Sequence, residues 1–370
     1  MKKYLIVGAG FSGAVLAEQL SQMQNVSVLV VDERDHIGGN CYTFQDEVTG
    51  ITEHKYGPHI FNTDSKVVWD YISKFTKMVP YTNRVKAICR GEVYSIPINL
   101  HTINQFFRKT LNPENARTFI DGIRDKKIKD PCNFEELALM TVGEDLYRAF
   151  FYYYSKKQWG CEPSLLPASI LKRIPVRFTY NDNYYDNKFQ GIPEEGYTPV
   201  FERMLNHHRV KVQLNVKFTE SFQTEEFDHV FYTGPIDSYF NYKFGRLGYR
   251  TVYFEKGYSE GDFQGNAVIN YTDDSVPYTR IHEHKHFTPW KHFNETIFFK
   301  EYSRETGEND IPFYPRLLPE DLIKLELYRE EAANLKRITF SGRLGNYCYM
   351  DMHNVINEAL GIASKFRQDI

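Results

Sequence analysis

The N-terminal residues change from a hydrophobic run to a helical pattern and back to a hydrophobic run. Residues 4–7 (YLIV) are consecutive apolar residues, which are typical of a buried strand. Over 13–23 the apolar residues recur at helical spacing, and 26–31 (VSVLVV) is again rich in β-branched residues. This order of strand, glycine turn, helix and strand predicts a βαβ unit in a parallel sheet that helices cover.

Later parts of the chain carry both periodicities. Helices are expected where apolar residues recur at helical spacing, at 66–76, most of 99–160, 198–207, 319–335 and 351–366. Strands are expected at 84–98, 210–233, 246–302 and 337–342, and 170–190 is expected to be irregular or strand. The sequence contains no internal repeat, low-complexity segment or flexible linker. Any domains are therefore expected to be woven together.

Three glycines lie between the first predicted strand and the helix. Gly8, Gly10 and Gly13 form a GxGxxG motif, in which the glycines allow a tight turn, close approach of a pyrophosphate and close helix–strand packing. Asp32 follows Gly13 by 19 residues, at the end of the second strand, where an acidic side chain can bind a ribose hydroxyl. A glycine turn without a ligand is the alternative. Strand, helix, strand and acid together favour a dinucleotide site.

Two further features favour FAD over NAD as that dinucleotide. Gly38 and Gly39 form a second glycine pair after Asp32, as flavoproteins often have. Asp351 could cap the last predicted helix, whose N-terminus would then point at a flavin ring or ribityl chain. There is no second GxGxxG for NAD(P)H. Either electrons arrive by another route, or the flavin does not serve net redox chemistry.

These elements predict an α/β protein with a discontinuous Rossmann-like FAD-binding domain, a helical insertion and an antiparallel β-sheet domain. The FAD-binding domain is expected to comprise 1–76, 196–236 and 316–370. The helical domain is expected at 100–165, and the antiparallel-sheet substrate domain at 77–99, 166–195 and 237–315.

Composition and charge limit which partners the protein can bind and which cellular compartment we expect for it. The chain has 370 residues, of which 42% are hydrophobic and 25% charged, as in ordinary globular proteins. Its net charge of −3 does not indicate a nucleic-acid-binding face, and no apolar stretch approaches the roughly 20 residues of a membrane helix. The five cysteines are odd in number and scattered, which favours reduced thiols in the cytoplasm.

Arginines and aromatic residues cluster in the middle of the chain. They occur in KKQWG (156–160), 171–185, 189–198 and 276–287. Arginine can make bidentate contacts with phosphate oxygens, and Trp159 and the tyrosines can stack or donate hydrogen bonds. A single arginine of this kind is usually a surface charge. Several such segments, punctuated by proline and glycine, favour an anionic ligand.

His282, His284 and His286 alternate and would share one face of a strand. Their spacing permits a metal site, although such a stripe is more often the polar face of a strand. We find no nearby cysteine or carboxylate that completes a ligand set, so we expect no metal.

Several motifs together resemble those of the bacterial UDP-galactopyranose mutases, a family of FAD enzymes. They run in order from residue 4 to about residue 360: HIGGN, HKYGPHIF, VGEDLY, KQWG, KRIPVRFT, QGIP, YTGPID, QGNAVIN, VPYTRIHEHKHF and DMH. Such a long ordered set is far more specific than GxGxxG alone.

The resemblance implies an isomerase that interconverts UDP-galactopyranose and UDP-galactofuranose without net redox change. FAD would be active when reduced, and its N5 would form an adduct with the sugar while UDP leaves and returns. This is nucleophilic catalysis by the cofactor. The resemblance also implies a homodimer and a role in cell-surface polysaccharide biosynthesis.

The resemblance further implies site residues by position. Arg173 and Arg280 would clamp the diphosphate and His59 would lie near the flavin, and we expect these three to be catalytic. Arg173 would lie on a loop that closes over the substrate. The expected substrate-binding residues are Asn83, Phe150, Phe151, Tyr154, Trp159, Arg173, Tyr184, Asn270, Arg280, Tyr314 and Tyr349. The expected cofactor-binding residues are Gly8, Gly10, Gly13, Asp32, Gly38, Gly39, Asn40, Arg250, Arg343, Asp351 and Met352.

Some positions depart from the family pattern. Asn62 stands where a second histidine is usual, Pro58 where alanine is usual, Tyr153 where glycine is common and Ser155 where threonine is common. A relative that acts on dTDP-fucopyranose or UDP-N-acetylgalactosamine would look similar. A flavin oxidoreductase, such as an amine oxidase relative, and a protein that only binds FAD or a nucleotide sugar are the remaining alternatives.

Overall fold

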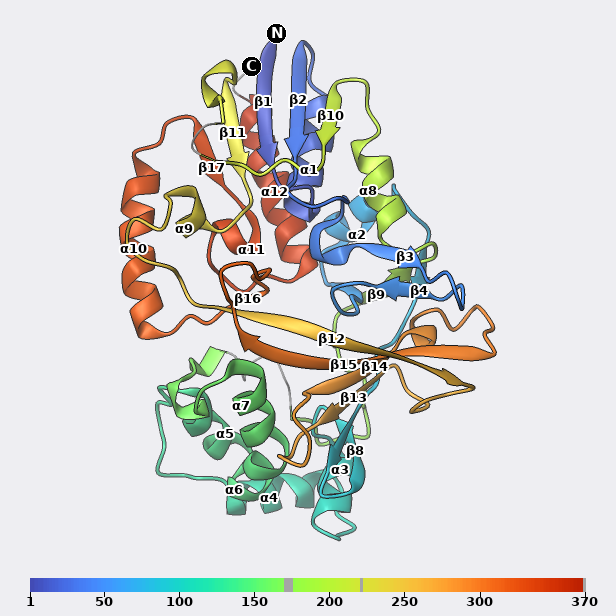
Figure 1. The fold of residues 1–370 in the computed structure, drawn as a ribbon. Helices are drawn as coiled ribbons and strands as arrows, with labels where there is room; N and C mark the ends of the chain where they lie inside the picture. The colour runs from blue at the N-terminus through green and yellow to red at the C-terminus, as the bar shows by residue number, and fades with distance from the viewer. Residues whose placement is uncertain (170–175, 220–221, 369–370) are drawn as a thin grey trace.

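The computed structural model describes residues 1–169, 176–219 and 222–368. Its main layers are a parallel sheet and a mostly antiparallel sheet, with a group of helices below the second sheet in the view of Figure 1. Both chain termini lie at the end of the parallel sheet that is farther from the second sheet (Figure 1). Among the described residues, no helix is both long enough and apolar enough to cross a membrane.

The parallel sheet has five strands in the order β10-β2-β1-β11-β17. They are β1 (Lys2–Val7), β2 (Val26–Val31), β10 (Val210–Gln213), β11 (His229–Tyr232) and β17 (Ile338–Phe340). Every neighbouring pair runs parallel. Strands from the N-terminal, middle and C-terminal parts of the chain therefore form one sheet, which confirms the predicted Rossmann-like fold.

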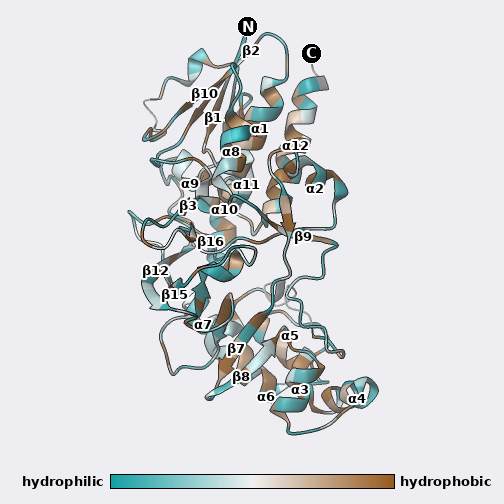
Figure 2. Cartoon of the chain, turned by 90° about the vertical axis from the view of Figure 1, so that its right-hand side faces the viewer, coloured by the Kyte–Doolittle hydropathy of each residue, from teal (hydrophilic) through white to brown (hydrophobic). Residues whose placement is uncertain are grey.

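Helices pack on the face of this sheet that carries its largest hydrophobic cluster. They are α1 (Phe11–Ser21), α2 (Lys66–Ile72), α8 (Thr198–Leu205) and α12 (Met352–Gln368). Helix α1 packs against both α8 and α12, so the last helix covers the first. In Figure 2 the sheet's strands are largely brown, whereas the helices alternate brown and teal, as expected for amphipathic elements.

The second sheet has seven strands in the order β16-β12-β15-β14-β13-β7-β8. They are β7 (Val85–Cys89), β8 (Glu92–Ile96), β12 (Tyr249–Glu260), β13 (Val268–Tyr271), β14 (Arg280–Glu283), β15 (Glu295–Glu305) and β16 (Tyr314–Pro315). The pair β7–β13 is parallel and the others are antiparallel. The long β12 and β15 ribbons cross the middle of Figure 1.

Residues 100–159 are mostly helical, as expected. The helices are α3 (Leu100–Phe106), α4 (Pro113–Ile123), α5 (Phe134–Val142), α6 (Glu144–Tyr147), the π-helix η2 (Arg148–Tyr152) and α7 (Tyr153–Trp159). Asparagines begin three of them: the side chains of Asn99, Asn112 and Asn133 accept N–H bonds at the first turns of α3, α4 and α5. The π turn was not predicted from the sequence.

Two small sheets and the remaining helices of the described residues complete the fold. Two small sheets contain β3 (Thr43–Gln45) with β4 (Thr52–His54), and β5 (Phe61–Thr63), β9 (Phe189–Pro193) and β6 (Met78–Pro80) in the order β5-β9-β6. The remaining helices are α9 (Ile236–Tyr239), α10 (Pro319–Ala333), α11 (Gly342–Gly345), and the short η1 (Gly39–Cys41), η3 (Pro163–Leu165), η5 (Thr224–Glu226) and η6 (His284–Phe287).

The expected strand over 246–302 is interrupted at the three alternating histidines. Strand β14 ends at Glu283, and η6 begins at His284, so the histidines do not share one strand face. His282 and His284 are fully buried, which makes the polar-face interpretation wrong for them. The three-part division of the chain remains our proposal for its domains.

Candidate active site

The glycine motif lies at the carboxyl end of β1 and forms one wall of a cavity. Gly8 has φ +105°, a conformation that L side chains rarely adopt. A Cβ on Gly13 would lie 1.9 Å from the Gly8 carbonyl oxygen, so only glycine lets α1 approach the turn. Gly39 lies against Gly10, where an added Cβ would be 3.1 Å from the Gly10 Cα. Together these glycines leave backbone exposed for a close-fitting ligand.

Asp32 ends β2 and ties the glycine turn to the sheet. Its Oδ2 accepts the Ala9 N–H at 2.7 Å, and its Oδ1 accepts the Arg34 N–H at 2.9 Å. Each oxygen keeps a second lone pair, so Asp32 can still accept a bond from a ribose hydroxyl in the cavity that it lines.

Arg34 supplies positive charge to the same cavity. Its Nη2 donates to Asn40 Oδ1 at 2.8 Å, and its guanidinium lies 4.6 Å from the centre of the Tyr56 ring. Its Nη1 is buried and makes no hydrogen bond within the protein. A buried donor without a partner, beside a glycine-walled cavity, fits a phosphate-bearing dinucleotide.

The cavity contains most of the predicted cofactor-binding residues. Those lining it are Gly8, Gly10, Asp32, Gly38, Gly39, Asn40, Arg343 and Met352, together with His59. Sequence reasoning did not select Ser12, Glu33, Arg34, Val216, Phe218 and Thr233, which also line it. Two signals were available: Ser12 lies inside the GxGxxG motif, and Glu33 and Arg34 directly follow Asp32. Val216, Phe218 and Thr233 follow strands β10 and β11, whose register the sequence does not reveal.

Three predicted cofactor residues do not line this cavity. Gly13 acts behind it, through the packing of α1. Asp351 directly precedes α12, and its carbonyl oxygen accepts the N–H groups of Asn354 and Val355. Arg250 is buried elsewhere: its Nε donates to Gln158 O and to Ser303 Oγ, both at 3.1 Å.

Arg343 connects the cavity to a pair of tyrosines. Its guanidinium donates to Met350 O at 2.7 and 3.1 Å and to Phe313 O at 3.2 Å. Tyr314 and Tyr349 stack with ring centres 5.6 Å apart, and Arg343 lies 5.4 and 5.2 Å from those centres. The predicted substrate tyrosines are thus brought together beside the cofactor cavity.

Arg280 begins β14 and is paired with a buried carboxylate. Its Nε donates to Glu301 Oε2 at 2.9 Å, and the Glu301 side chain is 1% exposed. Burial opposes the charge of Arg280, but Glu301 together with Tyr154 and Tyr314 raises the pKa of Arg280. The guanidinium therefore remains cationic, and its Nη groups, which are not needed for the Glu301 contact, can bind an anion.

His59 lines the cavity in its neutral form. Burial, aided by the nearby Arg343, lowers the pKa of His59 to about 4. Its Nδ1 lies 2.8 Å from the Gly57 carbonyl oxygen, which can only accept, so Nδ1 carries the proton. Nε2 is then left as a hydrogen-bond acceptor at neutral pH.

Arg280, Tyr184 and Tyr314 are all near enough to Tyr154 to perturb it electrostatically. Burial raises the pKa of Tyr154; Arg280 opposes this, and Glu301, Tyr184 and Tyr314 add to it. Trp159 packs near Tyr314, with ring centres 6.4 Å apart. These contacts bring α7, the start of β14 and β16 to one place. A cluster of neutral phenols around a fixed cation suits a polar anionic ligand.

Two predicted amides lie beside this cluster with buried oxygens that make no hydrogen bond within the protein. Asn83 is 3% exposed and Asn270 is 9% exposed, and in each the Oδ1 atom has no partner. Asn83 O accepts the Tyr184 N–H at 2.8 Å, and Asn270 pairs with Arg280 across the β13–β14 register. Unpaired buried acceptors indicate a ligand with donors.

Phe150 and Phe151 lie in the hydrophobic core of the helical region. Phe150 contacts the rings of Tyr94 and Phe106 at 5.1 and 5.6 Å, and Phe151 contacts Phe134 at 6.3 Å. The contacts described for them do not reach Arg280 or the tyrosine pair. Arg173 lies outside the described residues.

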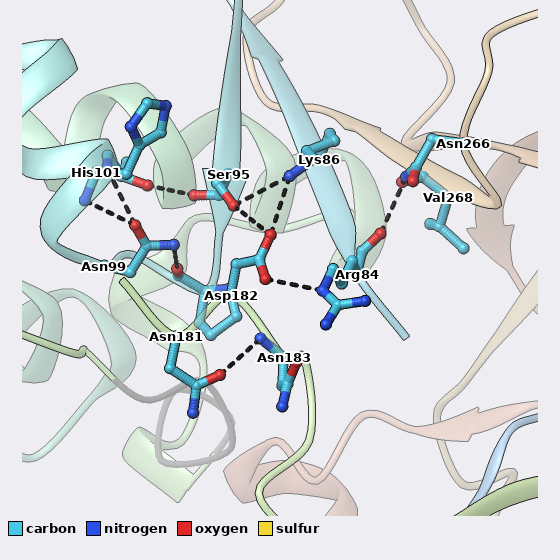
Figure 3. Close-up of polar contacts among 12 residues, drawn as sticks. Arg84, Lys86, Ser95, Asn99, His101, Asn181, Asp182, Asn183, Asn266 and Val268 are labelled. Atoms are coloured by element: carbon cyan, nitrogen blue, oxygen red, sulfur yellow. Dashed lines mark hydrogen bonds and ion pairs between the residues drawn. The ribbon is translucent and has the colours of Figure 1, made fainter. Parts of the chain in front are cut away.

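A second polar cluster, not selected from the sequence, precedes Tyr184 (Figure 3). The Asp182 carboxylate accepts from Arg84 Nε at 3.0 Å, Lys86 Nζ at 3.2 Å and Ser95 Oγ at 3.3 Å. Burial opposes this charge, but Lys86 and Arg84 lower the pKa of Asp182. The cluster attaches the chain before Tyr184 to β7 and β8 and satisfies its own polar groups.

The expectation that no nearby carboxylate completes a ligand set with the alternating histidines is wrong for His286. Ligand atoms of Asp262, Glu283 and His286 lie within 4.8 Å of one another. Asp262 is already paired with Lys285 Nζ at 2.6 Å, and Glu283 accepts backbone N–H groups of residues 263, 264 and 265. The cluster is thus arranged as an ion pair with a bound loop, and we assign no metal to it.

Comparisons with known proteins show the family of this chain. Residues 149–349 match the family model for UDP-galactopyranose mutase, and residues 6–75 match that for an NAD(P)-binding Rossmann-like domain. The chain is 52% identical to a probable UDP-galactopyranose mutase of Klebsiella pneumoniae, over 100% of this chain and 96% of that protein. It is 49% identical to a dTDP-fucopyranose mutase of Escherichia coli, over 99% and 98%.

Solved structures share the fold at low identity. A reduced UDP-galactopyranose mutase superposes with a TM-score of 0.75 at 15% identity, covering 100% of this chain and 94% of that one. A putative protoporphyrinogen oxidase from Exiguobacterium superposes with a TM-score of 0.67 at 14% identity, covering 100% and 99%. The fold is therefore common to mutases and oxidases, and the sequence matches distinguish them. The Rossmann domain and the family matches together imply a flavin cofactor, and the chain belongs to the UDP-galactopyranose mutase family.

Proposed function

We propose that this protein interconverts UDP-galactopyranose and UDP-galactofuranose, with FAD in the glycine-walled cavity and in its reduced state. The observation that carries the proposal is the cluster of Arg280, Tyr154, Tyr184 and Tyr314 beside that cavity. Reduced FAD would supply the nucleophile that displaces UDP from the sugar. The protein's own residues bind the diphosphate, orient the sugar and exclude water.

The cation and the phenols would divide the binding of the diphosphate. Arg280 keeps its charge through Glu301, so it can neutralise the phosphate that leaves and returns during the reaction. Tyr314 and Tyr349 stand beside the cofactor cavity, where their hydroxyl groups can donate to phosphate oxygens. We propose Arg173 as the second diphosphate ligand, on the strength of the sequence resemblance.

His59 would act at the flavin rather than at the phosphate. Its Nε2 remains a hydrogen-bond acceptor because the ring is neutral and the Gly57 contact holds the proton on Nδ1. An acceptor lining the cavity can bind an N–H or O–H group of the cofactor or sugar. Asn83 and Asn270 carry unpaired acceptors suited to the nucleotide.

A second substrate assignment has specific support. The dTDP-fucopyranose mutase of E. coli is nearly as similar to this chain as the Klebsiella protein is. Asn62, one of the unusual positions, is buried in β5, and its Nδ2 donates to Ile60 O at 3.2 Å. We therefore propose dTDP-fucopyranose as the alternative substrate, ahead of UDP-N-acetylgalactosamine. An oxidase activity would not require the arginine–tyrosine cluster.

Product analysis tests the proposal. Dithionite-reduced protein would be incubated without oxygen with UDP-galactofuranose, beside an oxidised control, and the products separated by anion exchange. Conversion to UDP-galactopyranose only in the reduced sample is the expected result. No conversion of UDP-galactofuranose by reduced holoprotein that does convert dTDP-fucofuranose would transfer the assignment to the alternative substrate.

We also propose a cytoplasmic homodimer that serves cell-surface polysaccharide synthesis. The five cysteines are all free thiols, which supports a reducing compartment. The homodimer rests on the family resemblance alone. Sedimentation equilibrium tests it, with a mass near twice that of the chain as the expected result.

A further inference from the structure

Lys157, on the last turn of α7, binds one loop through four backbone carbonyl groups. Its Nζ lies 2.8 Å from Tyr271 O, 2.8 Å from Asp273 O, 3.2 Å from Val276 O and 3.0 Å from Tyr278 O. An ammonium has three N–H donors, so at least one of them is shared between two oxygens. Burial lowers the pKa of Lys157 to about 8, and the carboxylates of Asp273 and Asp274 on the same loop partly offset this.

The loop that Lys157 binds is the tip of the β13–β14 hairpin. Directly below the tip, Asn270 ends the pairing on one strand and faces Arg280 on the other. Tyr271 N donates to Thr279 O, and Thr279 N donates to Glu301 O, both at 2.8 Å. The position of the tip therefore fixes the backbone from which Arg280 and Asn270 extend.

The other end of the contact is helix α7, which carries Tyr154 and Trp159. Its last turn is also attached to the β12–β15 ribbon, because Gln158 O accepts Arg250 Nε at 3.1 Å and Ser303 Oγ at 2.6 Å. A Cβ on Gly160, which ends α7, would lie 2.4 Å from Arg250 Nη1. The turn is thus held on one side by Arg250 and on the other by Lys157.

We propose that Lys157 is a positioning residue that fixes the β13–β14 tip to α7. It would thereby set the distance between two pairs of residues: Arg280 and Asn270 on the hairpin, and Tyr154 and Trp159 on the helix. This inference rests on the proposed function, because those four residues are proposed to bind the nucleotide sugar. Lys157 contacts neither the cofactor cavity nor the tyrosine pair in the contacts described for it. It acts through the two elements that it joins.

A cation with several donors is suited to this role. Carbonyl oxygens that converge on one point repel one another and need a positive charge or water to remain there. An apolar side chain of the same length would leave those oxygens to water and release the tip from α7. Lys156, the neighbouring residue, makes no comparable contact, since its Nζ pairs with the exposed carboxylate of Glu162 at 2.5 Å.

The test compares Lys157→Met with Lys157→Arg, and uses Lys156→Met as the matched control. Two quantities are measured on each holoprotein: the Kd for UDP by titration calorimetry, and kcat and KM with UDP-galactofuranose after dithionite reduction. FAD absorbance and the unfolding temperature are recorded alongside. A misplaced binding group can cost about 10²-fold, so we expect Lys157→Met to weaken UDP binding and kcat/KM by about 10- to 100-fold.

The controls separate positioning from folding. We expect Lys157→Arg to recover much of the UDP affinity, because its guanidinium also donates to several carbonyl groups, and Lys156→Met to match the wild type. Unchanged UDP affinity and kcat/KM in a folded Lys157→Met protein would overturn the inference. Should that variant fail to retain FAD, Lys157→Gln, which keeps two donors without the charge, replaces it under the same criterion.

The two proposals fail in different ways. If wild-type holoprotein neither binds UDP nor converts the sugar, the proposed function is wrong. If the wild type does both and the folded Lys157 variants do the same, only the positioning role is wrong.

Discussion

At the scale of single residues, the site depends on side chains whose charge state is set by their neighbours. Arg280 is kept cationic by Glu301, whereas His59 is kept neutral by burial and by Arg343. A fixed cation thus lies on one side, and a fixed hydrogen-bond acceptor lines the glycine-walled cavity on the other. Neither state could be assigned from the sequence, because both partners are distant along the chain.

Removing the cation should abolish turnover and spare the cofactor. We expect Arg280→Ala to reduce kcat/KM by at least about 10³-fold, since it removes charge stabilisation of the departing diphosphate. FAD should remain bound, because Arg280 does not line the glycine-walled cavity. Steady-state kinetics and the flavin absorbance spectrum measure both effects. Loss of FAD together with activity would contradict the assigned role, and we predict the same separation for Arg173→Ala.

The third glycine of the motif should be needed for the cofactor rather than for the substrate. In Gly13→Ala the added Cβ would lie 1.9 Å from the Gly8 carbonyl oxygen, so the turn or α1 must move. We expect purified protein to contain little FAD, measured as the ratio of flavin absorbance to protein absorbance. Gly361→Ala, where nothing lies within 4 Å of the added Cβ, is the matched control. Full FAD content in Gly13→Ala would show that the turn tolerates the change.

At the scale of elements, loops are attached to strands by buried charges. Glu283 is the last residue of β14, and it accepts three backbone N–H groups from residues 263–265. Burial opposes its charge, but His286 and the N–H groups lower the pKa of Glu283 to about 2. Lys157 attaches the β13–β14 tip in a similar way, but there a buried positive charge binds backbone carbonyl groups.

This arrangement predicts an acid-sensitive contribution to stability. Because the folded pKa of Glu283 lies below its unfolded value, its stabilisation is present above about pH 4.5 and is lost as pH falls toward 2. The shift corresponds to about 3 kcal/mol at neutral pH. Denaturant unfolding should therefore give Glu283→Gln a lower free energy of unfolding than the wild type at pH 7. This difference should shrink steadily from pH 4.5 to pH 3. If the difference in the free energy of unfolding does not depend on pH, the variant loses stability through packing instead of charge.

At the scale of the whole molecule, the cofactor cavity joins parts of the chain that are far apart in sequence. Its walls come from the first strand, the β2 end, the segment after β10, the residues before β16 and the start of α12. The parallel sheet likewise combines strands from both ends of the chain (Figure 1). A ligand in this cavity contacts all of these parts at once.

The cofactor should therefore stabilise the molecule as a whole. A ligand at 100 times its Kd adds about 2.7 kcal/mol to the free energy of unfolding, so removing FAD from this 370-residue chain should lower the unfolding temperature by about 3 to 4 °C. Adding FAD back should restore the unfolding temperature. Calorimetry of stripped and reconstituted protein measures this. If FAD does not change the unfolding temperature, the cofactor does not bind in this cavity.

The local part of the fold and of the cofactor site was predictable from the sequence. The βαβ unit, the glycine motif and Asp32 depend on residues within one short segment, where periodicity and turn chemistry act directly. The same is true of the long helices α10 and α12. The π turn over Arg148–Tyr152 escaped prediction because its residues continue an ordinary helical pattern.

The remaining features were decided by the tertiary structure. Arg250 carries the same chemistry as Arg280, yet it supports the end of α7, and the histidine stripe is divided between a strand and a short helix. Glu301, Arg34 and Lys157 gain their roles from partners brought close only by sheet register and helix packing. Sequence by itself determined which chemistry is available and where the dinucleotide turn lies. Long-range packing decided which charges meet, because an electrostatic or hydrogen-bonding role exists only between groups that the fold brings into contact.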